Sequence, residues 1–328
     1  MRYALTLFGL LCIASVVGPL ARAAGAEKDY PTRPIRLVVS QTPGSSIDTM
    51  SRVIATRLSE LLGQQLVVDN RTGAGGIIGG EIVAYSEPDG YTLFAAATAS
   101  QIIGPQIYKK VLKYNPQTDF TPISLFAITQ NVLVVNPSMP YSSVKELIAY
   151  AKANPGKVNW ANAGTGFQSH LAGVLLTHMA GINVLHVPYK GAGPMVGGVI
   201  AGESHVTIGP APAWMVHVQS GRARALAMGG EKRSMLWPEI PTISESGVPG
   251  YVSDGWAGLM GPKRLPKQIQ GKLRDLLVKA VNEPATSNAL KKVGAEPLTS
   301  TPAEFAKLIA KDWNRISEAI RVADLKVD

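Results

Sequence analysis

The chain has 328 residues, a formal net charge of +9 at pH 7 and a single cysteine, and its length suggests two domains of ~150 residues each. Cys12 lies in the apolar N-terminal segment, so the remainder can form no disulfide, thiolate nucleophile or cysteine metal site. The basic residues form no dense run and are not interleaved with aromatic residues, which argues against nucleic acid and favours small anionic partners.

The first segment of the chain has the pattern of a signal peptide. A basic residue precedes apolar residues 5–17, and Ala21-Arg22-Ala23 fits the small-x-small rule for signal peptidase. The apolar stretch is too short for a comfortable membrane span, and no later stretch is long and apolar enough. We therefore expect residues 1–23 to be a signal peptide, with cleavage possible up to residue 26, and the mature chain to be exported.

Strand-like and helix-like segments alternate along the mature part of the chain. Strands are expected at residues 35–40, 65–70, 91–98, 131–137, 158–164, 184–189, 205–210 and 223–229. Helices are expected at about residues 47–61, 143–156, 169–180, 269–281 and 305–320. This alternation predicts an α/β fold with largely parallel sheets and helices on both faces.

Three glycine- and serine-rich loops stand between an expected strand and an expected helix. They are PGSSID (43–48), AGTGFQSH (163–170) and YKGAGP (189–194). Backbone N–H groups at a helix start, together with the positive end of the helix dipole, favour a carboxylate or phosphate. In open α/β sheets such loops lie at the carboxyl ends of strands, where ligands bind. Each loop alone is also explained as a well-capped helix start, but three of them favour an anion receptor.

Several enzyme and cofactor signatures are missing from the sequence. The chain has no G-x-S-x-G, no G-x-x-x-x-G-K-[ST] and no H-E-x-x-H. In the glycine runs 73–80 and 191–198, the third glycine comes one position late for a dinucleotide-binding fingerprint. The five histidines show no paired metal-ligand spacing. We therefore expect no catalytic residues, no cofactor and no metal.

The quoted loops also carry a family resemblance. The segments YPTRPIRLVVSQTPGSSID, VVDNRTGAGGIIGGEIVA, PDGYTL, DFTPISL, KANPGKVNWANAGTG, SHLAG, HVPYKG and PTISESGVPGY occur in this order. They resemble the Bug receptors, which are the periplasmic solute receptors of tripartite tricarboxylate transporters. The resemblance runs from about Tyr30 to the C-terminus.

This resemblance implies a type II periplasmic binding protein fold, in which two α/β domains close on a ligand cleft between them. The first domain would comprise residues 27–130 plus 250–328, and the second residues 131–249. It also implies a periplasmic monomer that binds a small carboxylate, either a di- or tricarboxylate or an aromatic acid, and delivers it to membrane subunits of the transporter. Crossing strands near residues 132–136 and 253–256 are the expected hinges.

The resemblance carries a set of ligand-binding positions onto the strand–helix loops. These are Gly44, Ser45, Ser46, Asp48, Thr98, Ser100, Gly164, Thr165, Gly166, Ser169, Tyr189 and Lys190. Main-chain groups and ordered waters would hold most of the carboxylate. Asp48 is expected to cap its helix or bind water rather than touch the acid, and for Lys190 an ordinary surface position is the alternative.

The chain departs from the usual family pattern in two places. Ser40-Gln41-Thr42 stands where the first loop is commonly preceded by Pro-aromatic. The segment GPAPAW, residues 209–214, replaces residues that are often polar or acidic. The less polar wall leaves room for a longer or aromatic acid. Trp214 is a candidate for that wall, and an ordinary core position is the alternative.

Two classes of function stay open at this point. The favoured one is a binding protein that delivers a carboxylate to a transporter, and the other is an exported sensor that presents the acid to a membrane signalling partner. Neighbouring genes would separate them, since two membrane subunits indicate transport and a sensor kinase indicates signalling. A secreted hydrolase is a distant third, because the chain has no recognisable nucleophile.

Overall fold

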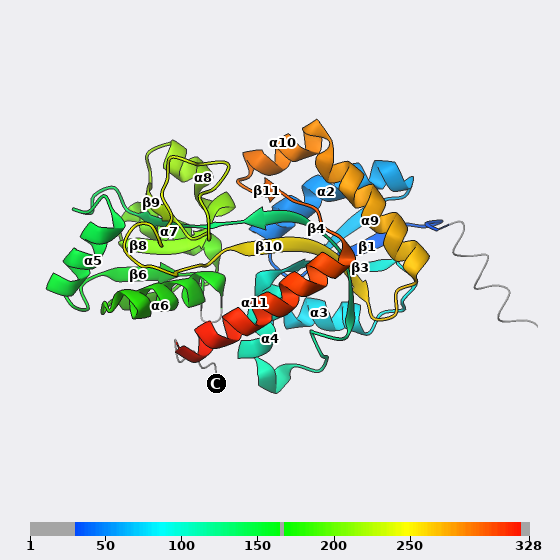
Figure 1. The fold of residues 1–328 in the computed structure, drawn as a ribbon, viewed down its shortest axis with the longest axis horizontal. Helices are drawn as coiled ribbons and strands as arrows, with labels where there is room; N and C mark the ends of the chain where they lie inside the picture. The colour runs from blue at the N-terminus through cyan, green and yellow to red at the C-terminus, as the bar shows by residue number, and fades with distance from the viewer. Residues whose placement is uncertain (1–29, 165–166, 323–328) are drawn as a thin grey trace, which may run out of the picture.

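The structure is a computed structural model that describes residues 30–164 and 167–322, with the strands in two separate sheets (Figure 1). The predicted signal peptide and two predicted site residues, Thr165 and Gly166, lie outside the described residues. Within the described ranges, no helix combines the length and the apolar character needed to cross a membrane.

The first sheet has the strand order β11-β4-β10-β3-β1-β2. Its strands are β1 (Ile35–Val39), β2 (Leu66–Asn70), β3 (Thr92–Ala97), β4 (Phe120–Thr129), β10 (Gly255–Pro262) and β11 (Glu296–Pro297). β1 pairs in parallel with β2 and β3, whereas β10 runs antiparallel to β3 and β4, and β11 antiparallel to β4. The apolar runs of β1, β3 and β10 are almost entirely buried, as expected for strands covered on both faces.

The second sheet has the order β7-β6-β8-β5-β9. Its strands are β5 (Asn131–Val135), β6 (Asn159–Asn162), β7 (Leu185–Pro188), β8 (Val206–Pro210) and β9 (Arg224–Met228). β6 pairs in parallel with β7 and β8, but β5 runs antiparallel to β8 and β9. The expectation of largely parallel sheets is therefore wrong. β5 continues from β4 of the other sheet without a crossover helix, so it enters the second sheet in the direction opposite to β8, which follows α7.

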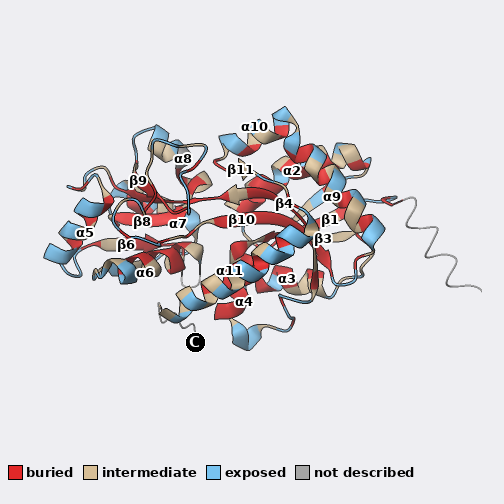
Figure 2. Ribbon diagram, viewed as in Figure 1, coloured by how far each residue is buried: buried red, intermediate tan, exposed pale blue. Residues whose placement is uncertain are grey.

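Helices cover both sheets. Around the first sheet lie α2 (Ser46–Leu62), α3 (Ile77–Ala84), α4 (Gly104–Ile107), α9 (Lys267–Asn282), α10 (Pro284–Lys292) and α11 (Pro302–Val322), with the short turns η1 (Ala74–Gly76), η2 (Ala99–Ile103) and η3 (Lys109–Val111). Around the second lie α5 (Val144–Ala153), α6 (Gln168–Ala180), α7 (Ala192–Ala201) and α8 (Ala211–Gln219). Figure 2 shows strands that are mostly buried and helices that expose only their outer faces.

The first long helix, α2, shows why the sequence folds this way. Its buried residues Ile47, Met50, Ile54 and Leu58 recur at steps of three and four and pack with β1 and β3 in one apolar cluster. The helix ends at Gly63, whose φ of 68° is a left-handed conformation that costs glycine little. The hydrophobic face fixes α2 against the sheet and thereby fixes the position of its N-terminus.

Two segments cross between the sheets, side by side. β4 runs into β5 through Gln130, and the chain returns from the second sheet into β10, which pairs with β4 (Figure 1). Asn131 donates its side-chain amide to the carbonyl of Ser253, which ties the two crossings together. Leu171 on α6 packs in the same apolar cluster as Trp256 on β10. The domain boundaries and hinges expected from the sequence stay predictions.

Candidate ligand-binding site

The loops after β1, β2 and β3 touch one another at the carboxyl edge of these strands. Asn70, the last residue of β2, donates its side-chain N–H to the Gln41 carbonyl at 2.9 Å. A Cβ added to Gly76 would lie 2.6 Å from Ser100 Cβ and 3.1 Å from Ser40 Oγ. The loops that carry the predicted residues after β1 and β3 therefore both adjoin Gly76, at the edge where ligands bind in open α/β sheets.

The buried carboxylate of Asp48 holds the loop before α2. Ser45 is the N-cap, and its Oγ accepts a hydrogen bond of 3.4 Å from Asp48 N. The Asp48 carboxylate accepts hydrogen bonds of 2.9 Å from both Gly44 N and Asn70 Nδ2, and it lies 3.0 Å from Arg52 Nη2. Burial alone would raise the pKa of Asp48, but the bonds from Arg52, Gly44 and Asn70 together lower it below its ordinary value. Asp48 is therefore ionised at neutral pH, and it positions the loop.

The same network decides which backbone donors of this loop stay open. Gly44 N is bonded to Asp48, and the N–H groups of Asp48 and Thr49 are bonded to Ser45. The N–H groups of Ser46 and Ile47, the first two residues of α2, have no hydrogen bond among the described residues. They stand at the positive end of the helix dipole, so they can bind an anion.

The side chains predicted after β3 anchor their own loop. Thr98 is 2% exposed, and its Oγ1 accepts a hydrogen bond of 3.0 Å from Trp256 N. Ser100 Oγ donates to Ala97 O at 3.3 Å and accepts from Ala97 N at 3.2 Å. Thr98 thus links β3 to the crossing strand β10, and Ser100 closes a local turn.

The loop between β6 and α6 is held by neutral side chains. Ser169 Oγ accepts a hydrogen bond of 3.0 Å from Ala163 N, and Asn162 Oδ1 accepts one of 3.0 Å from Gly164 N. Gly164 has a φ of 122°, which residues with a side chain rarely adopt. The N-cap, Phe167, offers no side-chain oxygen. The neighbouring site residues Thr165 and Gly166 are among those not described.

Tyr189 and Lys190 follow β7, and their side chains have different surroundings. The Tyr189 hydroxyl bonds to Ser204 Oγ at 2.9 Å, and its ring packs so close to α7 that a Cβ on Gly198 would lie 2.2 Å from the hydroxyl. Ser204 precedes β8, so the Tyr189 side chain runs away from the carboxyl edge of the strands. Tyr189 N is bonded to Asn162 O. Lys190 is exposed and forms no ion pair with the described residues.

Sequence reasoning missed a polar cluster at the crossing strands. Gln168, Thr98 and Thr129 surround Gly255 at the start of β10. Gln168 stands inside the quoted segment AGTGFQSH, but nothing in its spacing indicates that Gly255, far along the chain, comes close to it. Ser40 was also missed as a candidate. It is 3% exposed, and its Oγ has no hydrogen bond within the described part of the chain.

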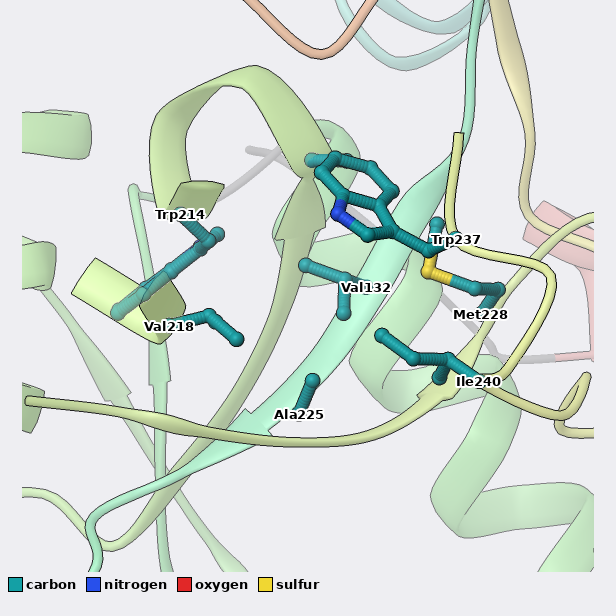
Figure 3. Close-up of a pocket in the computed structure, with 8 residues that line it drawn as sticks. Val132, Trp214, Val218, Ala225, Met228, Trp237 and Ile240 are labelled. Atoms are coloured by element: carbon teal, nitrogen blue, oxygen red, sulfur yellow. The ribbon is translucent and has the colours of Figure 1, made fainter. Parts of the chain in front are cut away.

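An apolar pocket adjoins the second sheet, and none of its lining residues belongs to these loops (Figure 3). It has an empty volume of about 230 Å³ and is lined by Val132, Ala211, Trp214, Val218, Ala225, Met228, Trp237 and Ile240. Trp214 is fully buried in an apolar cluster, so it occupies a core position. None of the lining side chains is charged, so the pocket offers a carboxylate no ion-pair partner. In the described ranges, no three metal-binding side chains come together.

Comparison with known sequences supports the receptor interpretation. Residues 50–325 match the model of a family described as the tripartite tricarboxylate transporter family receptor, TctC. BugT of Bordetella pertussis is 34% identical over 320 residues, which cover 96% of this chain and 98% of BugT.

Solved structures share the fold over most of their length. Rpa4515 of R. palustris, solved with adipate, is 34% identical, with a TM-score of 0.84 over 90% of this chain and 99% of that one. MatC of Rhodopseudomonas palustris, solved with bound malate, is 26% identical, with a TM-score of 0.80 over 89% of this chain and 100% of that one. The predicted two-domain α/β periplasmic binding fold is thereby confirmed.

Proposed function

The chain belongs to the tripartite tricarboxylate transporter receptor family, a family of solute-binding receptors rather than enzymes, and we propose that it captures a small carboxylate for such a transporter. In this proposal residues 1–23 are removed on export, and the mature protein works in the periplasm as a monomer. Its partners are the bound acid and the membrane subunits of the transporter.

The observation that carries the proposal is the pair of open N–H groups at Ser46 and Ile47. They stand at the positive end of a 17-residue helix. Asp48, the nearest acid, is bonded to Arg52 and Asn70, so its charge is compensated. A carboxylate can therefore approach these donors without meeting an unpaired negative charge.

The class of acid follows from the relatives and from the chain's own composition. Adipate and malate, which accompany the two similar structures, are both dicarboxylates. Trp214 lies in the core, and the half-buried Pro210, Pro212 and Ala213 are the uncharged residues of segment 209–214 that would favour an acid with an apolar middle. We therefore place dicarboxylates first and aromatic acids second.

Ligand capture is proposed to close two domains, residues 27–130 plus 250–328 and residues 131–249, about the crossing segments. Small-angle scattering should give a smaller radius of gyration with saturating acid. An identical radius with and without acid would contradict closure.

The direct test is a thermal-shift screen of mono-, di- and tricarboxylates against neutral sugars. An acid that binds only the native protein stabilises it by about 2.7 kcal/mol at 100 times its dissociation constant. We expect at least one dicarboxylate to raise the melting temperature clearly. A shift with sugars and with no acid would overturn the carboxylate assignment.

A further inference from the structure

Four segments from both sheets meet at Gly255, the first residue of β10. A Cβ added to Gly255 would lie 2.9 Å from Gln168 Nε2, 3.3 Å from Thr129 Oγ1 and 3.5 Å from Thr98 Oγ1. Thr98 follows β3, Thr129 ends β4, and Gln168 begins α6 in the other layer. Because Gly255 has no side chain, the Gln168 amide can lie beside it, where the two sheets meet.

The polar groups around Gly255 have unused hydrogen-bonding capacity. Thr98 Oγ1 accepts from Trp256 N, which leaves its own proton to donate. Thr129 is 7% exposed, and neither its hydroxyl nor the Gln168 amide is hydrogen-bonded to any described residue. Gln168 is half-buried, and neither unpaired group is sealed from solvent, so the cluster is accessible to a polar partner from outside the chain.

The cluster itself is neutral, which limits what it can recognise. The adjacent Asp254 pairs with Arg315 at 3.1 Å, and Arg315 also bonds to Asp312 at 3.0 Å and to the carbonyl of Val252 at 3.2 Å. Arg315 is thus engaged within the chain. An amide and two hydroxyls donate to an oxygen in fixed directions without supplying a positive charge. Such donors discriminate between ligands by the position of an oxygen atom rather than by the ligand's charge.

We propose that Gln168 is a specificity-determining residue whose amide, together with Thr129, binds the second carboxylate of a dicarboxylate held at its first carboxylate by the start of α2. The assignment rests on the proposed function, because it concerns the same cleft. It predicts that Gln168 separates dicarboxylates from monocarboxylates of equal length.

The test is calorimetric titration of the mature protein with adipate and with hexanoate, which lacks the second carboxylate. Gln168→Leu should weaken adipate binding about 3- to 10-fold, the loss of one hydrogen bond, and leave hexanoate binding unchanged. Gln168→Glu should weaken adipate binding by more than about 10-fold, because a like charge faces the carboxylate. Gln219→Glu, at an exposed glutamine that ends α8, is the matched control and should bind as the wild type does.

The outcomes separate this inference from the proposed function. If the wild type binds no acid in the screen, the proposed function fails, and this inference fails with it. If the wild type binds adipate and both Gln168 variants bind it equally well, only the inference is overturned. An equal loss for adipate and hexanoate would also overturn it, because Gln168 would then act on a group that both acids share.

A different contact joins the two layers on the opposite side of the crossing strands. Ser234 Oγ donates to Glu296 Oε1 at 2.6 Å, and Met235 N donates to the same oxygen at 3.2 Å. A Cβ on Gly294 would lie 3.1 Å from the Trp237 ring. We call these contacts the rear clasp; they join the segment after β9 to β11 and the turn before it.

The strand orders place the rear clasp on the side of the crossing strands away from the candidate ligand loops. In the first sheet β11 lies on one side of β4 and β10, and β3, β1 and β2 lie on the other. In the second sheet β9 lies on one side of β5, and β8, β6 and β7 lie on the other. The candidate ligand loops follow β1, β3, β6 and β7. A rotation about the crossing strands that brings these loops together separates β11 from the segment after β9.

From this topology we infer, independently of Gln168, that the rear clasp stabilises the open cleft and lowers ligand affinity. Glu296→Ala should tighten adipate binding about 3- to 10-fold, because less interaction energy is lost on closure. It should also give the ligand-free protein a smaller radius of gyration by small-angle scattering. Glu239→Ala, at an exposed glutamate of the same segment, is the matched control. Unchanged or weaker binding by Glu296→Ala, with wild-type binding intact, would overturn the inference.

Discussion

The starts of α2 and α6 follow the same sequence pattern but are held in different ways. Before α2, an ionised Asp48 bonds to Gly44, Asn70 and Arg52. Before α6, Ser169 and Asn162 make single neutral bonds to the backbone, and the N-cap Phe167 offers none. The shared pattern of a strand, a glycine-rich loop and a helix start therefore does not predict how firmly the loop is held.

The difference has a consequence for how the two loops bind. The charged network before α2 fixes the loop and leaves the N–H groups of Ser46 and Ile47 open. The loop before α6 instead places a neutral side chain, Gln168, near the crossing strands. We expect the first loop to supply affinity through fixed donors and the second to supply discrimination between acids.

Removal of the Asp48 carboxylate should have the largest effect on stability. Asp48→Ala leaves Gly44 N and the Asn70 amide without their acceptor and Arg52 without its partner. Because Arg52 is half-exposed, we expect a loss of about 2–4 kcal/mol in the free energy of unfolding, somewhat less than the roughly 3–5 kcal/mol for breaking a fully buried pair. Urea unfolding measures it. A loss under about 1 kcal/mol would mean that the charged network does not hold the loop.

The contribution of Asp48 should also depend on pH. Its folded pKa is lower than its ordinary value, so its stabilisation is fully present above about pH 5 and is lost as the pH falls through the folded pKa. The difference in unfolding free energy between the wild type and Asp48→Asn should therefore narrow below pH 4. Urea unfolding of both proteins at a series of pH values gives this curve. A difference that stays constant down to pH 2 would contradict an ionised Asp48 as its source.

The corresponding change before α6 should cost less. Ser169→Ala removes the acceptor of the buried Ala163 N–H, and one unpaired buried donor costs about 1–3 kcal/mol. The loss in Ser169→Ala should be smaller than in Asp48→Ala when both are measured by urea unfolding. If Ser169→Ala proves the more destabilising, the comparison between a charged and a neutral loop is reversed.

The helix starts were predictable from the sequence, but the contacts between residues far apart in the chain were not. The spacing of Ser45 and Asp48 indicated a capped helix, and the apolar steps from Ile47 onwards indicated α2. These signals lie within one or two helical turns. The direction of Tyr189 and the approach of Gln168 to Gly255 depend on how helices and sheets pack, which no local pattern encodes.

The mixed strand directions escaped prediction for a similar reason. Alternating strands and helices indicated parallel pairs, and β1, β2 and β3 do pair in parallel. The antiparallel strands β5 and β10 arise where the chain passes from one sheet to the other. The sequence was compatible with Trp214 either in a cleft wall or in the core, and its complete burial shows that it lies in the core.

The most direct test of the account is the affinity of Ser46→Pro for the acid that gives the largest thermal shift. Ser46 is the first residue of α2, where proline fits the helix, and Ser45 has the extended ψ of 162° that a residue before proline prefers. The variant therefore removes one open N–H and leaves the fold intact, and Ser46→Ala controls for the hydroxyl.

Calorimetric titration should show a loss of affinity of about 10-fold or more for Ser46→Pro, since bonds to a charged group contribute about 1.5–3 kcal/mol. Ser46→Ala should lose about threefold or less. Both variants should keep the melting temperature of the ligand-free wild type. Wild-type affinity in a folded Ser46→Pro protein would contradict the account, because the start of α2 would then be a helix cap that binds no acid.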